Sequence, residues 1–384
     1  MSWPAEPIGL LAGPRGRRLC FELVSPYRDH PRAESYPGLR DLRFGSEVAE
    51  PPQLAAELSD LVARADLTEL AATAAEAALL QPAAEAVTAA MYWQPPDEVD
   101  QVLADPLLAG VLAPVAQAVA AAPAARWWSS PADQGRQRCV QFLSREPQQS
   151  QQPPELRGAA AKLAGWRART IEDERDAASR PADPAAAYSG FWWSTPAHAQ
   201  LVSTTRSVPG LPAVGLALVE DPMDWTEART WPLRPRPGAR VYEIHGPADW
   251  SELVARYPLE VTRSRWHDWW NVTGRAGTWL IPDFAVVAAD YDGVHLTVGG
   301  YLSTAGRALP ASAPDSDYSG YPGYSETDAA GDPDRAATML AGWDPDRTFW
   351  LADVLEPAGP AARFENPGQE VLGWEPADDP APGD

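Results

Sequence analysis

A strand followed directly by a helix is the clearest structural signal in the chain, at residues 240–257, RVYEIHGPADWSELVARY. The β-like piece Arg240–Ile244 precedes a glycine and a proline, and Ala248–Tyr257 is expected to be helical. Further β-like pieces are expected at Phe191–Thr195, Val214–Val219, Thr278–Ile281, Val294–Leu302 and Thr348–Val354, with a second helix at Asp283–Asp290. This alternation, with turn residues between the pieces, predicts a mixed, mainly antiparallel α+β domain.

The chain before residue 188 predicts a different, mainly helical region. Apolar side chains between residues 54 and 62 recur at the spacing of one helix face. Asp66, with Glu69 three residues later, has the pattern of a helix-capping box. Pro82 is expected to divide the helix that follows, because a proline lacks the amide hydrogen of the helical ladder. A polar helix is expected at Glu155–Arg180.

These patterns divide the chain into an irregular segment (1–50), a mainly helical region (51–187), the α+β domain (188–355) and a flexible acidic, proline-rich tail (356–384). The α+β domain contains a stretch rich in Ser, Asp, Gly and Tyr at 311–335. Its composition predicts a mobile insertion.

The composition is strongly acidic, with 53 acidic and 31 basic residues and a net charge of −22. Residues 311–384 hold 16 of the acidic residues and only 3 arginines. Such a surface repels phosphates and anionic lipids, so we expect no nucleic-acid or membrane partner. The 17 tryptophans and the arginine-rich, lysine-poor usage are typical of a GC-rich bacterial genome, so they do not by themselves indicate a ligand site.

Targeting and metal signals are missing from the sequence pattern. The apolar piece Ile8–Ala12 precedes its arginines, the reverse of a secretory signal. The two cysteines, Cys20 and Cys139, are far apart and outside any metal-ligand spacing, so we expect both to be buried and no metal to be bound. Cys20 lies in Arg18–Val24, which is either a strand or a short helix. A cytoplasmic location fits this pattern.

No P-loop, dinucleotide-binding glycine fingerprint, nucleophile elbow or zinc-protease motif is present. The densest group of chemically active side chains is RSRWHDWW at residues 263–270. Arg263 and Arg265 suit a phosphate or carboxylate, and Trp266 suits a stacked ring. His267 and Asp268 are candidates for acid–base chemistry. Alternatively, the tryptophans pack in the core and the arginines pair with nearby acids.

Two further groups carry candidate residues. In FWWST, residues 191–195, the candidate ligand-binding residues are Trp193, Ser194 and Thr195, and Arg206 follows shortly after. These hydroxyls equally suit turns and caps. In the third group His295 lies on the polar face of a predicted strand, either exposed or in a cleft, and is the third candidate catalytic residue.

Residues 188–353 resemble the mono-ADP-ribosyltransferase-type fold in the order of their short motifs. An aromatic strand leads to Ser-Thr (Trp193–Thr195), a later strand leads to a proline-bearing helix start (Val241–Pro247), a Tyr-Asp-Gly-Val turn follows (Tyr291–Val294), and Trp-Asp-Pro-Asp (Trp343–Asp346) precedes a last strand. The resemblance implies NAD bound between two small sheets and a late catalytic glutamate. The strand at 294–302 carries no acid, and Glu243 comes too early to match. The whole chain also resembles a family of high-GC, actinobacterial-type bacterial proteins, which implies no function.

The sequence leaves two functional hypotheses beside an unassigned globular protein. In the first, the C-terminal domain is an enzyme that binds NAD or a related nucleotide near Arg263, Arg265, Trp266 and His267. In the second, the protein is a non-catalytic module that binds a protein partner. A deep pocket with perturbed pKa values favours the enzyme, and a flat exposed tryptophan patch favours the module.

Overall fold

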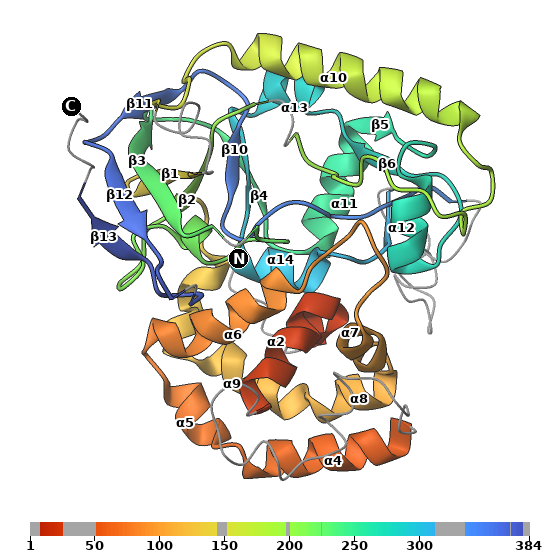
Figure 1. Ribbon diagram of the computed structural model, residues 1–384, viewed down its shortest axis with the longest axis vertical. Coiled ribbons are helices and arrows are strands. Elements are labelled where there is room, and N and C mark those ends of the chain that lie inside the picture. The colour runs from red at the N-terminus through yellow and green to blue at the C-terminus, as the bar shows by residue number, and fades with distance from the viewer. Residues whose placement is uncertain are drawn as a thin grey trace.

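The computed structural model describes residues 8–25, 51–143, 152–196, 200–223, 225–311, 335–368 and 370–378. The chain forms a helical part, lower in Figure 1, and a part built on a mixed sheet. The α+β class expected from the sequence is therefore confirmed. Nearly all of the expected insertion at 311–335 lies outside the described residues.

The helical part consists of short helices. They are α1 (Ile8–Ala12), α2 (Pro14–Val24), α4 (Pro51–Arg64), α5 (Leu67–Ala72), α6 (Glu76–Thr88), α7 (Glu98–Leu103), α8 (Pro106–Val111), α9 (Ala113–Ala121) and the 3-10 helix η2 (Pro123–Ser129). The predicted apolar face of α4 is buried. Asp66 caps α5 as expected, since its carboxylate accepts the Glu69 N–H at 2.9 Å. The expected irregular segment is wrong over residues 8–24, because its apolar side chains pack as α1 and α2.

Pro82 does not divide the predicted second helix. It lies inside α6, and the break comes earlier, between α5 and α6. Leu79, Leu80 and Ala83 around it are fully or almost fully buried. Burial of this apolar surface offsets the hydrogen bond that the proline cannot make.

A nine-stranded sheet forms the second part, with the order β13-β12-β3-β1-β2-β10-β7-β4 and with β11 also paired to β3. Its strands are β1 (Gln137–Phe142), β2 (Ser203–Arg206), β3 (Glu227–Pro235), β4 (Val241–Ile244), β7 (Gly293–Leu296), β10 (Thr348–Trp350), β11 (Leu355–Pro357), β12 (Ala362–Glu365) and β13 (Glu375–Ala377). The pairing of β4 with β7 is parallel and the other pairings are antiparallel. Two small ladders join β5 (Pro258–Glu260) to β6 (Leu280–Pro282) and β8 (Leu309–Pro310) to β9 (Ala337–Thr338).

Helices surround this sheet and connect it to the helical part. They are α10 (Ala159–Asp176), α11 (Pro247–Arg256), α12 (Trp266–Thr273), α13 (Phe284–Asp290) and α14 (Val298–Thr304). Helix α14 packs against α1 and α2, and α10 packs against α13 along the top of Figure 1. One continuous hydrophobic core includes Leu19 of α2, Leu302 of α14 and Trp343. The two parts therefore share buried surface.

Three predicted strands differ from the structure. Phe191–Thr195 joins no sheet. Val214–Leu216 is the 3-10 helix η5, and because its residues are all buried, periodicity cannot distinguish a strand from a helix there. Val294–Leu302 is a strand only as far as Leu296. The Thr297 hydroxyl then accepts the Gly300 N–H at 2.9 Å and starts α14.

The acidic C-terminal stretch is ordered as far as it is described. Residues 355–377, expected to belong mostly to a flexible tail, contain β11, β12 and β13. Phe364 is buried in the core, and Arg363 pairs with Glu227 at 2.7 Å. These apolar and paired side chains bind the stretch to the sheet despite its acidic composition.

Both cysteines are buried, as predicted. Within the described ranges, no helix combines the length and apolar character needed to cross a membrane.

Candidate functional site

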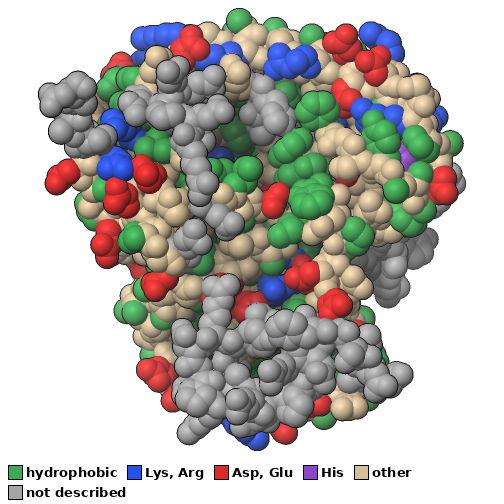
Figure 2. Space-filling view, viewed as in Figure 1, with side chains coloured by type: hydrophobic (Ala, Val, Ile, Leu, Met, Phe, Trp, Pro, Cys, Tyr) green, Lys and Arg blue, Asp and Glu red, His purple; other side chains and the backbone are tan. Residues whose placement is uncertain are grey.

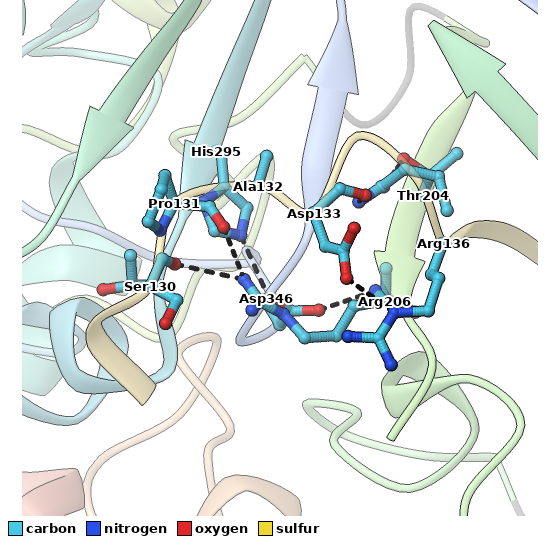
Figure 3. A network of polar contacts seen from close by, with 12 residues as sticks. Ser130, Pro131, Ala132, Asp133, Arg136, Thr204, Arg206, His295 and Asp346 are labelled. Atoms are coloured by element: carbon cyan, nitrogen blue, oxygen red, sulfur yellow. Dashed lines mark hydrogen bonds and ion pairs between the residues drawn. The ribbon is translucent and has the colours of Figure 1, made fainter. Parts of the chain in front are cut away.

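Four charged side chains from separate elements meet beside the sheet, and we call them the His295 quartet: Glu243, His295, Asp346 and Arg206. Figure 3 shows the last three of them. The His295 Nδ1 lies 2.6 Å from Glu243 Oε2, and its Nε2 lies 3.3 Å from Asp346 Oδ1. Arg206 Nε donates to Asp346 Oδ1 at 2.5 Å. The charges alternate in sign along this row.

Strand register explains why the quartet meets. In the parallel pair β4–β7, Glu243 lies opposite His295, so both side chains project on the same face. Asp346 precedes β10, the strand between β2 and β7, and there its carboxylate reaches Arg206 of β2. Its φ of 58° is left-handed, a conformation that aspartate tolerates better than most residues.

The quartet is closed and charge-balanced. Burial alone lowers the pKa of His295, but the carboxylates of Glu243 and Asp346 outweigh it and raise the pKa to about 9. The remaining groups are bonded too: Glu243 Oε1 accepts the Ala132 N–H, and Arg206 Nη2 donates to two carbonyls before β1. Both ring nitrogens of His295 are engaged within the protein, so the arrangement is a closed ion network.

The predicted cluster at 263–268 also comes together, at the start of α12. Arg263 is exposed, and its backbone N–H donates to Glu174 Oε1 at 2.7 Å. Arg265 is buried and donates from Nε to the Trp193 carbonyl at 3.1 Å; burial lowers its pKa to about 10, although Asp173 lies 3.3 Å away. The Trp266 indole donates to the Ala182 carbonyl at 3.1 Å.

His267 and Asp268 are almost fully buried on the same helix. The Asp268 carboxylate accepts the Gly190 N–H at 3.0 Å, and the His267 ring lies 5.1 Å from that of Tyr188. Burial raises the pKa of Asp268. Together with the contacts of Arg265 and Trp266, these interactions hold α12 against α10 and residues 182–193, a contact region that we call the α12 seam.

The other predicted ligand residues are separated from one another. The Ser194 and Thr195 hydroxyls donate to the Ala341 and Gly342 carbonyls at 3.1 and 3.3 Å. Trp193 stacks on Trp192 with ring centroids 4.4 Å apart. Arg206 lies in the His295 quartet. The predicted site residues therefore lie in three separate places: the quartet, the α12 seam and the segment Trp193–Thr195.

A cleft with a volume of about 730 Å³ lies between the helical part and residues of α12 and of the segment after α14. In Figure 2 basic and acidic side chains lie close together between the lower, helical part and the upper part, below a group of hydrophobic side chains. The charged lining comes from four arginines and two aspartates: Arg15, Arg17, Arg275, Arg307, Asp97 and Asp100. We call it the arginine cleft.

The two carboxylates of the arginine cleft are already paired. Asp100 forms an ion pair with Arg15, and Asp97 accepts from Arg18 at 2.9 Å. Arg17 instead donates to the Leu11 and Ala12 carbonyls at 3.0 and 3.3 Å, which orient the guanidinium without neutralising it. Burial, followed by repulsion from Arg307 and Arg15, lowers the pKa of Arg17 to about 10.

The other two arginines are also oriented by main-chain carbonyls. Arg275 donates to the Thr278 carbonyl at 3.3 Å and Arg307 to the Ser303 carbonyl at 3.4 Å. The lining also contains apolar residues: Ala89, Ala90, Met91, Pro95, Pro96, Val272 and Ala308. Like-charged guanidinium groups together with apolar residues are the chemistry of a site for an organic anion.

Sequence reasoning missed the arginine cleft because its lining comes from four distant segments, residues 12–17, 89–104, 272–275 and 306–308. The one available signal was the arginine-rich start of α2, which entered only the argument about secretion. None of the predicted site residues lines this cleft.

Comparison with known proteins gives no match to a family model, to a curated protein or to a solved structure. In the part of the chain that the structure describes, no group of three or more His, Cys, Asp or Glu side chains is placed to hold a metal ion.

Proposed function

We propose that the protein binds a small organic anion in the arginine cleft, with the anionic group against the arginines and an apolar or aromatic body against the apolar residues of the lining. The observation that carries this proposal is the convergence of Arg15, Arg17, Arg275 and Arg307 on one cleft of ligand size in a chain of net charge −22. Natural ligands of this class bear a phosphate or a carboxylate.

The electrostatics of Arg17 support this reading. Burial is the largest cause of the lowered pKa of Arg17, and repulsion from Arg307 and Arg15 lowers the pKa further. A bound anion relieves this repulsion and accepts charge-assisted hydrogen bonds. The acidic surface elsewhere opposes the approach of an anion, so the binding energy must come from local contacts.

NAD and ADP-ribose, the ligands implied by the family resemblance, belong to this chemical class and are included among the probes. Catalysis is not part of the proposal. Neither the His295 quartet nor the His267–Asp268 pair lines the arginine cleft.

The test is isothermal titration calorimetry with 1-naphthalenesulfonate, NAD, ADP-ribose and inorganic pyrophosphate, and with uncharged 1-naphthalenemethanol as the matched control ligand. We expect the sulfonate to bind and the alcohol to bind at least about tenfold more weakly, since charge-assisted bonds contribute roughly 1.5–3 kcal/mol. Pyrophosphate, which lacks the apolar body, is expected to bind more weakly than the organic anions.

The matched protein variants are Arg17→Gln in the cleft and Arg136→Gln outside it. Arg136 is exposed and pairs with Asp133. We expect Arg17→Gln to weaken sulfonate binding about tenfold and Arg136→Gln to leave it unchanged. Absence of binding by every anion, or equal loss in both variants, contradicts the proposal.

A further inference from the structure

A buried carboxyl group, that of Glu220, interacts electrostatically with two residues that line the arginine cleft, Arg15 and Tyr92. Glu220 is 8% exposed, and neither carboxylate oxygen accepts a hydrogen bond of good geometry, although the Tyr301 phenol and the Gly342 N–H lie near it. Its backbone N–H donates to Asp344 Oδ1 at 2.9 Å. A buried acid without firm partners requires an explanation, because its desolvation costs free energy.

Two tyrosines connect Glu220 to the cleft. Tyr301 of α14 is fully buried and lies next to Glu220 on one side and Tyr92 on the other. Tyr92 lines the cleft, and its ring lies so close to Gly306 that a Cβ added there would come within 2.5 Å of it. Both phenol oxygens are buried and, like Glu220, make no hydrogen bond of good geometry. A row of three side chains therefore runs from the interior to the lining of the cleft: Glu220, Tyr301 and Tyr92.

Arg15 also links the Glu220 carboxyl to the cleft electrostatically. It lines the cleft, is 2% exposed, and its positive charge acts on Glu220, Tyr301 and Tyr92. Burial, followed by the carboxylate of Asp344, raises the pKa of Glu220 to about 8, against the smaller opposing effects of Tyr301, Gly342 and Arg15. At neutral pH the group is therefore mostly protonated.

We propose that Glu220 is a proton-binding site coupled to the arginine cleft, so that an anion held in the cleft favours the protonated carboxyl and ionisation of Glu220 releases the anion. The inference rests on the proposed function, and it adds regulation of the same site. The sign follows from charge: a carboxylate formed at Glu220 repels an anion bound in the cleft. By linkage, anion binding takes up protons over the range in which Glu220 ionises.

The test uses 1-naphthalenesulfonate, whose own charge does not change in this range, and calorimetry in two buffers of different ionisation enthalpy. We expect the affinity of the wild-type protein to fall about tenfold from about pH 7 to about pH 9. Binding near pH 8 is expected to take up a fraction of a proton. In Glu220→Gln both effects disappear, whereas Glu172→Gln, on the exposed face of α10, retains them.

Tyr301→Phe gives a second, independent readout. The Tyr301 phenol favours the ionised form of Glu220, so its removal raises the midpoint of the pH dependence. An unchanged pH profile in Glu220→Gln, a flat profile in a wild-type protein that binds the sulfonate, or an unmoved midpoint in Tyr301→Phe overturns the inference and leaves the proposed function standing. Absence of sulfonate binding at every pH refutes the proposed function, and the inference with it.

Discussion

The His295 quartet and the arginine cleft contain the same kinds of side chain and differ in how their charges are balanced. In the quartet two carboxylates alternate with an imidazolium and a guanidinium, and every group is bonded within the protein. In the cleft Arg17 has carbonyl partners and like-charged neighbours. A balanced buried network holds elements together, whereas a partly exposed guanidinium such as that of Arg17, with like-charged neighbours, is suited to an external anion.

The largest expected effect is on stability and comes from the quartet. Asp346→Asn keeps a residue that tolerates the left-handed backbone but removes the charge between Arg206 and His295. Breaking a buried pair in this way is expected to lower the free energy of unfolding by about 3 kcal/mol, as measured by urea denaturation.

Glu356→Gln is the control for that substitution. It removes a pair with the exposed Arg236, worth about 0–1 kcal/mol. If the two variants lose equal stability, the distinction between a structural network and an ordinary surface pair is wrong.

The second prediction concerns pH. The folded-state pKa of His295, about 9, lies above its ordinary value of about 6.5. Its contribution to stability is therefore complete below about pH 6.5 and is lost as the pH rises through about 9, by roughly 2–3 kcal/mol in total.

Glu220 weakens stability over an overlapping range, since burial also raises its pKa. The difference between the wild type and His295→Gln isolates the histidine. Denaturation curves at several pH values are expected to show the steeper decline in the wild type, and parallel curves would contradict the assignment.

The third prediction is that a substitution at Arg263 has almost no effect. Arg263 is exposed on the α12 seam and lies outside the arginine cleft. Arg263→Ala is therefore expected to leave both stability and sulfonate affinity within about 0.5 kcal/mol of the wild type. A loss of affinity as large as that of Arg17→Gln would move the anion site to α12.

Local patterns predicted the elements whose cause is local. The cap at Asp66, the apolar face of α4 and the strand at residues 241–244 follow from short spacings, and the structure contains all three. The prediction of a strand at Val214–Val219 is wrong for Val214–Leu216, because an apolar run that is buried on every side has no periodicity to interpret. The predicted strand does not extend over Val298–Thr304, because the N-cap at Thr297 starts a helix where the alternation of apolar and polar residues ends.

The sites depend on contacts between distant residues. His295 and Arg206 were singled out separately, but their common partner Asp346 is 140 residues from Arg206 in the sequence. The cleft joins α2 to residues after α14, and no local pattern indicates that pairing. Side chains can be chosen from sequence by chemical type, but their balance of charge is set by the tertiary structure.

The most direct test of the account is a crystal structure of the wild-type protein with 1-naphthalenesulfonate. We predict the sulfonate within hydrogen-bonding distance of Arg17 or Arg307, with the naphthalene ring against Met91 and Pro95. A sulfonate bound at Arg263 or Arg265 on α12, with the arginine cleft holding only solvent, would contradict it.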